Sequence, residues 1–359
     1  MTKRKHAKAA FPAAVSLLMA SALAGGAVPA GEFQATVVPL SGENLSGPCA
    51  FRLSLPALNK LVRAVWLTYD RGYDIQKYYS DPDVVSFAER HGIALLLASQ
   101  CAAEDPPTQE KGEMDMDPSR GVARSIYSAL DDFARQSHHP EISSAKLIML
   151  GFSGIGALFG HFVQYAPDRV VAAILANPGQ TEPWGMIGLN LSTRALAVPE
   201  LIIVGAADER AGTQRPFDYF TRHRRQGAPW VFVVQNGIPH CCVIDAKALI
   251  LEWLHGIISL RQPRADKPLL AVDTSAGWTG SIQPCESSRR DEKEYPLRDI
   301  CNATTQRAGY RDPEGFVSAA WFPDRDLALH WLSYIKQRQH PADSFPDGRD
   351  AAHSAFAMH

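Results

Sequence analysis

Three residues whose types together suit nucleophilic catalysis follow one another along the chain, each just beyond a short apolar run. They are Ser153, Asp208 and His240, in that order. A serine hydroxyl is a weak nucleophile until a base removes its proton and an acid orients that base. The pattern therefore predicts Ser153 as the nucleophile, His240 as the base and Asp208 as the acid.

The serine stands in a turn between an expected strand and an expected helix. The apolar run 146–150 leads into Gly-Phe-Ser-Gly, and a helical pattern follows over 157–165. A sharp strand-to-helix turn of this kind exposes the hydroxyl above a sheet, and the N–H of the next residue, Gly154, points to the same place. Glycines after a strand also occur in phosphate-binding turns, but the G-x-G-x-x-G spacing and a P-loop lysine are both lacking here.

From about Cys49 to Ile257 the chain resembles the α/β-hydrolases, and most closely their secreted esterase and polyester-depolymerase-like branch. The resemblance rests on the strand–turn–helix motif around Ser153 and on the chain order serine, aspartate, histidine, each at the carboxyl edge of an expected strand. It implies the same three catalytic roles, an acyl-enzyme intermediate, and no metal or organic cofactor.

Members of this family bind the developing oxyanion with two backbone N–H groups. The resemblance implies Gly154 as the first donor and the backbone of Asp70 or Arg71, after an early strand, as the second. Tyr73 and Trp184 are candidate substrate-binding residues, with packing or surface roles as the alternative.

The chain departs from the family pattern at Ile155. The G-x-S-x-G motif has glycine at this position. A branched side chain here is expected to crowd the approach of strand to helix, and Gly156 is expected to relieve part of the strain.

The three catalytic candidates need a scaffold that brings distant strand ends together. Short apolar runs alternate with helical patterns, which is typical of a mainly parallel sheet covered on both faces. The seven expected strands are Cys49–Leu55, Ala64–Tyr69, Ile93–Ser99, Lys146–Gly151, Val170–Ala176, Leu201–Val204 and Trp230–Val234. The expected helices between them are Asp83–Arg90, Val122–Arg135, Ile155–Tyr165, Pro216–His223 and Ala246–Ile257. We therefore expect an α/β fold with a doubly wound, mostly parallel sheet of the α/β-hydrolase type and a small C-terminal extension.

The chain is expected to divide into four parts. These are a signal peptide at 1–30, a catalytic domain at 31–260, an extension packed on the core at 261–340 and a disordered tail at 341–359. Within the extension, Asp326–Lys336 carries the apolar stripe of a helix that packs against a core.

The N-terminal segment has the pattern of a secretory signal. Basic residues at positions 3–8 precede an uncharged run at 9–28. Val28-Pro29-Ala30 then offers small residues at the −3 and −1 cleavage positions, with Ala22-Leu23-Ala24 as a second choice. The competing interpretation is a membrane anchor, since the run is roughly as long as a spanning helix. Its many Ala and Gly residues and Pro12 favour the signal peptide. We expect a secreted or periplasmic protein with no membrane contact in the mature form.

An oxidising compartment makes the cysteines disulfide candidates. The six are Cys49, Cys101, Cys241, Cys242, Cys285 and Cys301. Their spacing does not select one set of pairs. Cys285 with Cys301 is the favoured local pair, and a bridge from either cysteine beside His240 would pin the histidine loop.

Composition limits the partners. Among 359 residues, 36 Lys and Arg stand against 38 Asp and Glu, for a net charge of −2. A surface that neutralises phosphates needs a basic excess, so nucleic acid is excluded as a partner. No spacing of Cys and His suggests a metal.

The sequence favours a serine hydrolase that cleaves small-molecule or polymeric carboxylic esters, with a serine peptidase or a catalytically silent binding protein of the same fold as alternatives.

Overall fold

The computed structural model describes residues 31–55, 61–70, 75–99, 101, 115–179, 189–240, 244–284, 300–309 and 319–337. The segments assigned from sequence to a signal peptide and to a disordered tail lie outside these ranges, so both stay predictions.

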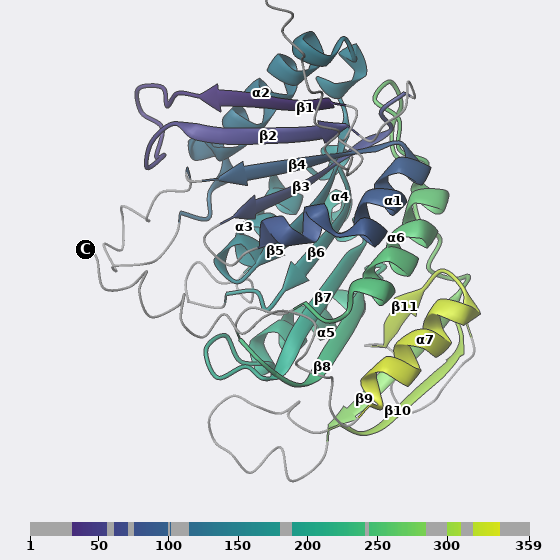
Figure 1. Ribbon diagram of the computed structural model, residues 1–359. Coiled ribbons are helices and arrows are strands. Elements are labelled where there is room, and N and C mark those ends of the chain that lie inside the picture. Colours follow the sequence, from purple (N-terminus) through teal and green to yellow (C-terminus); the bar gives the residue numbers. More distant parts are fainter. Residues whose placement is uncertain are drawn as a thin grey trace, which may run out of the picture.

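One large sheet organises the fold (Figure 1). Its eight strands lie in the order β1-β2-β4-β3-β5-β6-β7-β8. They are β1 (Gly31–Val37), β2 (Cys49–Leu55), β3 (Ala64–Asp70), β4 (Ile93–Ser99), β5 (Lys146–Phe152), β6 (Val170–Ala176), β7 (Glu200–Ala207) and β8 (Val231–Pro239). The strands from β3 to β8 are mutually parallel, whereas β1 and β2 pair antiparallel at one edge. The predicted fold class is confirmed.

The central strands are largely apolar because helices cover both faces of the sheet. Every residue of β6 is buried, and β5 is buried from Leu147 onward. In Figure 1, α1 and α6 lie in front of the sheet and α2 and α3 behind it. The helices are α1 (Pro82–His91), α2 (Val122–Ser137), α3 (Gly154–Tyr165), α4 (Thr193–Leu196), α5 (Gln214–Arg224), α6 (Lys247–Arg261) and α7 (Arg325–Ile335). Short 3-10 turns occupy Ile75–Ser80, Pro118–Arg120, Pro140–Ile142 and Pro167–Arg169.

The sequence prediction was wrong about the end of the last parallel strand. Its apolar run ends at Val234, but β8 continues to Pro239. Gly237 has a φ of 76°, and the pairing of β8 with β7 shifts register between Gly205 and Ala207. A glycine that signals a turn in the sequence thus forms an irregularity inside a longer strand.

The C-terminal part forms a second, smaller sheet with one helix. Strands β9 (Trp278–Pro284), β10 (Ile300–Arg307) and β11 (Ala320–Phe322) pair antiparallel in the order β10-β9-β11. Helix α7 packs on this sheet and beside α6, at the β8 edge of the large sheet (Figure 1). The indole N–H of Trp331 donates to the carbonyl of Phe232 in β8 at 2.7 Å.

A disulfide joins Cys49 to Cys101 across 52 residues. Cys301 is disulfide-bonded as well. Cys285, Cys241 and Cys242 lie outside the described ranges, so the pairing of Cys285 with Cys301 stays a prediction. None of the helices in the described part of the chain is long and apolar enough to cross a membrane.

Candidate active site

Ser153 occupies the sharp turn between β5 and α3. Its backbone has φ 55° and ψ −125°, a conformation that costs a non-glycine residue about 1–3 kcal/mol. Two backbone hydrogen bonds of 2.9 Å hold it there: its N–H donates to the Ala176 carbonyl, and its own carbonyl accepts from Gly179. The turn therefore holds the serine at the carboxyl edge of β5, beside the end of β6.

Strand β5 and helix α3 approach each other most closely at the backbone atoms of their glycines. A Cβ on Gly151 would lie 2.5 Å from the Ile155 carbonyl oxygen and 2.7 Å from the Gly156 nitrogen, so only glycine fits at 151. A Cβ on Gly156 would lie 3.2 Å from both the Gly151 oxygen and the Pro178 Cα. The Ile155 side chain itself belongs to the hydrophobic core and is 1% exposed.

Asp208 follows the end of β7 and is completely buried. Its Oδ1 accepts hydrogen bonds from the backbone N–H groups of Arg210 at 2.9 Å and Ala211 at 2.8 Å. These bonds fix the carboxylate and leave Oδ2 to face the histidine. A buried carboxylate needs such partners to remain charged.

His240 follows β8 directly and links the other two residues. Its Nδ1 lies 2.7 Å from Oδ2 of Asp208, and its Nε2 lies 3.0 Å from Oγ of Ser153. With the proton on Nδ1 donated to Asp208, Nε2 accepts the serine O–H. The ring of Phe152 packs 5.5 Å from the imidazole centroid and limits its movement.

Asn177 is a buried residue of this site that sequence reasoning missed. Its Nδ2 donates to the His240 carbonyl at 2.9 Å, and its Oδ1 accepts from the Gly205 N–H at 2.8 Å. The residue has a φ of 42°, a conformation that asparagine tolerates better than most residues. The sequence could have indicated Asn177 by its position. It directly follows the strand Val170–Ala176, and Ser153, Asp208 and His240 follow strands at the same edge of the sheet.

The structure describes two of the three expected oxyanion donors, Gly154 and Asp70, so their role stays a prediction. Gly154 is the first residue of α3, where backbone N–H groups have no acceptor within the helix. Asp70 is the last residue of β3, which pairs with β5 through Thr68 and Leu150. Arg71, Tyr73 and Trp184 lie outside the described residues. In the described part of the chain, no group of three or more His, Cys, Asp or Glu side chains is placed to hold a metal ion.

The sheet order, the strained serine turn and the three residues at the strand ends together define the architecture. The chain has the α/β-hydrolase fold. No protein-family model and no curated protein sequence matches it.

Solved structures resemble this chain in fold. Poly(aspartic acid) hydrolase-1 from Sphingomonas sp. KT-1 is 16% identical over 58% of this chain and 93% of its own, with a TM-score of 0.41. An esterase from Pyrobaculum calidifontis is 16% identical over 64% and 85%, with a TM-score of 0.43. A ferulic acid esterase is 14% identical over 64% and 94%, with a TM-score of 0.41. These likenesses are distant, with each TM-score below 0.5.

Proposed function

We propose that this α/β-hydrolase-fold protein cleaves carboxylic esters with Ser153, His240 and Asp208 as a catalytic triad. The observation that carries the proposal is the unbroken hydrogen-bonded line from the Ser153 hydroxyl through both ring nitrogens of His240 to the buried Asp208 carboxylate. This is the arrangement that turns a serine into a nucleophile.

The reaction begins with attack of Ser153 Oγ on the acyl carbon of the ester. His240 Nε2 takes the hydroxyl proton as the new C–O bond forms, and Asp208 stabilises the imidazolium through Nδ1–H. The tetrahedral oxyanion accepts from the N–H of Gly154 and from a second backbone N–H after β3. Collapse of this intermediate expels the alcohol, which takes the proton from His240 and leaves an acyl-enzyme.

Water completes the cycle by the same chemistry. His240 removes a proton from a water molecule, the hydroxide attacks the acyl carbon, and Ser153 leaves with the returned proton. No electron acceptor or metal enters either half of this mechanism.

Esterase assays of Ser153→Ala test the proposal. We expect the variant to fold normally and to lose about 10⁴-fold or more of kcat with p-nitrophenyl acetate. Ser259→Ala is a matched control, because the Ser259 hydroxyl donates to the carbonyl of His255 within its own helix, α6. A fluorophosphonate probe should label wild type and the control but not Ser153→Ala. Unchanged turnover in Ser153→Ala would refute the proposal, and the absence of both turnover and labelling in wild type would favour a silent binding protein.

A paired comparison separates ester from amide cleavage. p-Nitrophenyl acetate and the corresponding p-nitroanilide present the same acyl group to the triad. We expect turnover of the ester and little turnover of the anilide. The reverse preference would assign the protein to the peptidases.

The proposal includes export of the protein. Its support is the signal-like pattern at 1–30 and the buried disulfide between Cys49 and Cys101, since such bonds persist in oxidising compartments. Mass spectrometry of the exported chain should find Gly31 as its first residue. A retained N-terminal segment would refute cleavage and favour the anchor.

A further inference from the structure

A basic hollow lies at the edge of the large sheet opposite the triad. Arg63 directly precedes β3, and Gly92 directly precedes β4, whereas Ser153, Asp208 and His240 follow the carboxyl ends of β5, β7 and β8. Seven residues of parallel strand separate the two edges, which is roughly 20 Å. The hollow is therefore distinct from the triad.

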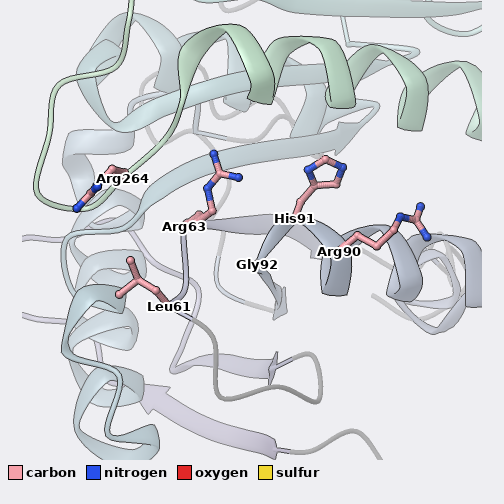
Figure 2. A pocket seen from close by; sticks show the side chains of 6 residues that line it. All are labelled: Leu61, Arg63, Arg90, His91, Gly92 and Arg264. Atoms are coloured by element: carbon pink, nitrogen blue, oxygen red, sulfur yellow. The ribbon is translucent and has the colours of Figure 1, made fainter.

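Three of its six lining residues are arginines. Leu61, Arg63, Arg90, His91, Gly92 and Arg264 surround a volume of about 330 Å³. Figure 2 shows the side chains of Arg63 and His91 pointing to the same side, toward the helix α6. Arg264 comes from the loop after that helix. The lining thus combines three separate parts of the chain.

The positive charge of the three arginines is only partly neutralised by neighbouring side chains. Arg264 pairs with Asp266 at 3.0 Å, and Arg90 donates to the Ser86 hydroxyl at 2.6 Å. Within the described residues, Arg63 makes no side-chain hydrogen bond or ion pair. A guanidinium that has no partner in a hollow retains all of its donors for a ligand.

A backbone hydrogen bond and a neighbouring glycine determine the position of Arg63. Its backbone N–H donates to the Gly92 carbonyl at 2.8 Å. A Cβ on Gly92 would lie 3.5 Å from Cγ of Arg63 and 3.0 Å from the Leu61 carbonyl oxygen, and Gly92 has a φ of 65°. Glycine at 92 therefore suits the left-handed backbone and the close approach of the Leu61 carbonyl, and the stem of Arg63 lies in ordinary contact beside it.

The helix end explains only part of this cluster. Arg90 and His91 complete the last turn of α1, where cations complement the helix dipole. Arg63 and Arg264 belong to other elements, so the dipole does not account for them. Burial lowers the pKa of His91, and the charges of His255, Arg63 and Arg90 lower it further. Arg63 and Arg90 thus lie close enough to His91 to act on its imidazole electrostatically.

We propose that the hollow of Arg63, His91 and Arg264 binds a phosphate group. Arginine forks suit the oxygens of a phosphate and hold it by charge-assisted hydrogen bonds. The volume is at the lower end of small-molecule sites and leaves room for an organic substituent of the phosphate against Leu61, which is 57% exposed. The net charge of −2 gives the chain no basic excess beyond this hollow for a nucleic acid.

Calorimetric titration with inorganic phosphate and with phenyl phosphate tests the site, at constant ionic strength. We expect saturable binding of both, and tighter binding of phenyl phosphate if the natural ligand is a phosphate monoester. Equal affinity would identify free phosphate as the ligand. Both results support a phosphate site, whereas the absence of saturable binding by either compound overturns it.

Variants locate the binding. Arg63→Gln should weaken binding about tenfold or more, because one charged donor is lost. Arg264→Gln, on an exposed loop, should also weaken it and provides a second test if Arg63→Gln is unstable. Arg52→Gln is the matched control, since Arg52 is exposed on β2 and lines no part of the hollow. Ser153→Ala should bind as wild type does. Equal binding by Arg63→Gln, Arg264→Gln and Arg52→Gln would overturn the proposal.

Discussion

Asn177 offers a sharp test of how this fold positions its histidine. The side chain holds two backbone groups at once, the carbonyl of His240 and the N–H of Gly205. Asn177→Gly removes both bonds without adding strain at the φ of 42°. Each buried backbone group left without a partner costs about 1–3 kcal/mol, and there are two of them, so we expect a loss of about 2–6 kcal/mol in the free energy of unfolding.

The catalytic effect should exceed what this loss of stability explains. The released His240 carbonyl lets the imidazole shift relative to Ser153, and a misplacement of about 1 Å costs about 100-fold in rate. We expect kcat for p-nitrophenyl acetate to fall about 10- to 100-fold with little change in KM, because the change affects the transition state more than substrate binding. Urea unfolding and steady-state kinetics measure the two quantities.

Asn236→Ala provides the matched control. The Asn236 Nδ2 donates to the Ile335 carbonyl at 2.9 Å, so this asparagine also tethers two segments but does not hold His240 itself. The control should lose stability and keep its kcat. If Asn177→Gly also retains kcat within about twofold of wild type, the tether to His240 does not position its imidazole for the reaction and the reasoning is refuted.

Two further predictions concern stability. Burial lowers the pKa of His223 to about 4, so the unfolded chain binds its proton first as the pH falls below about 6.5. Stability should therefore fall by about 2 kcal/mol more between pH 7 and pH 4.5 in wild type than in His223→Gln, and equal urea-unfolding losses would contradict this. Replacing both Cys49 and Cys101 with serine opens a loop of 52 residues and should cost about 2–4 kcal/mol; an unchanged urea midpoint would show that the bond does not constrain the unfolded chain.

The pattern of apolar residues along the sequence was sufficient to predict most strands of the large sheet. The runs Ile93–Ser99 and Val170–Ala176 match β4 and β6 to the residue, because continuous apolar runs between polar segments are typical of strands buried on both faces. The run Cys49–Leu55 matches β2, in which buried and more exposed residues alternate. The strand β1 was not predicted. It is an edge strand that alternates exposed and buried residues and pairs only with β2, so its apolar signal is weak.

The candidate triad was recognised for a related reason. Ser153, Asp208 and His240 each follow an apolar run, and parallel strands bring their carboxyl ends to one edge. Asn177 satisfies the same rule but has no reactive group, so reasoning from chemistry passed over it. The basic hollow joins residues 63, 91 and 264, and no local pattern indicates that these positions meet.

The C-terminal part bears on the histidine through the edge strand that presents it. β8 is the last strand of the large sheet, and an uncovered edge invites pairing with other chains. The backbone N–H of Trp321 donates to the Trp230 carbonyl at 2.8 Å, just before β8 begins, and the Trp331 indole binds the carbonyl of Phe232. A Cβ on Gly280 would lie 2.4 Å from the Trp331 ring, so glycine in β9 makes room for that indole. Because His240 directly follows β8, the cover that protects this edge also fixes the strand from which the imidazole reaches Ser153.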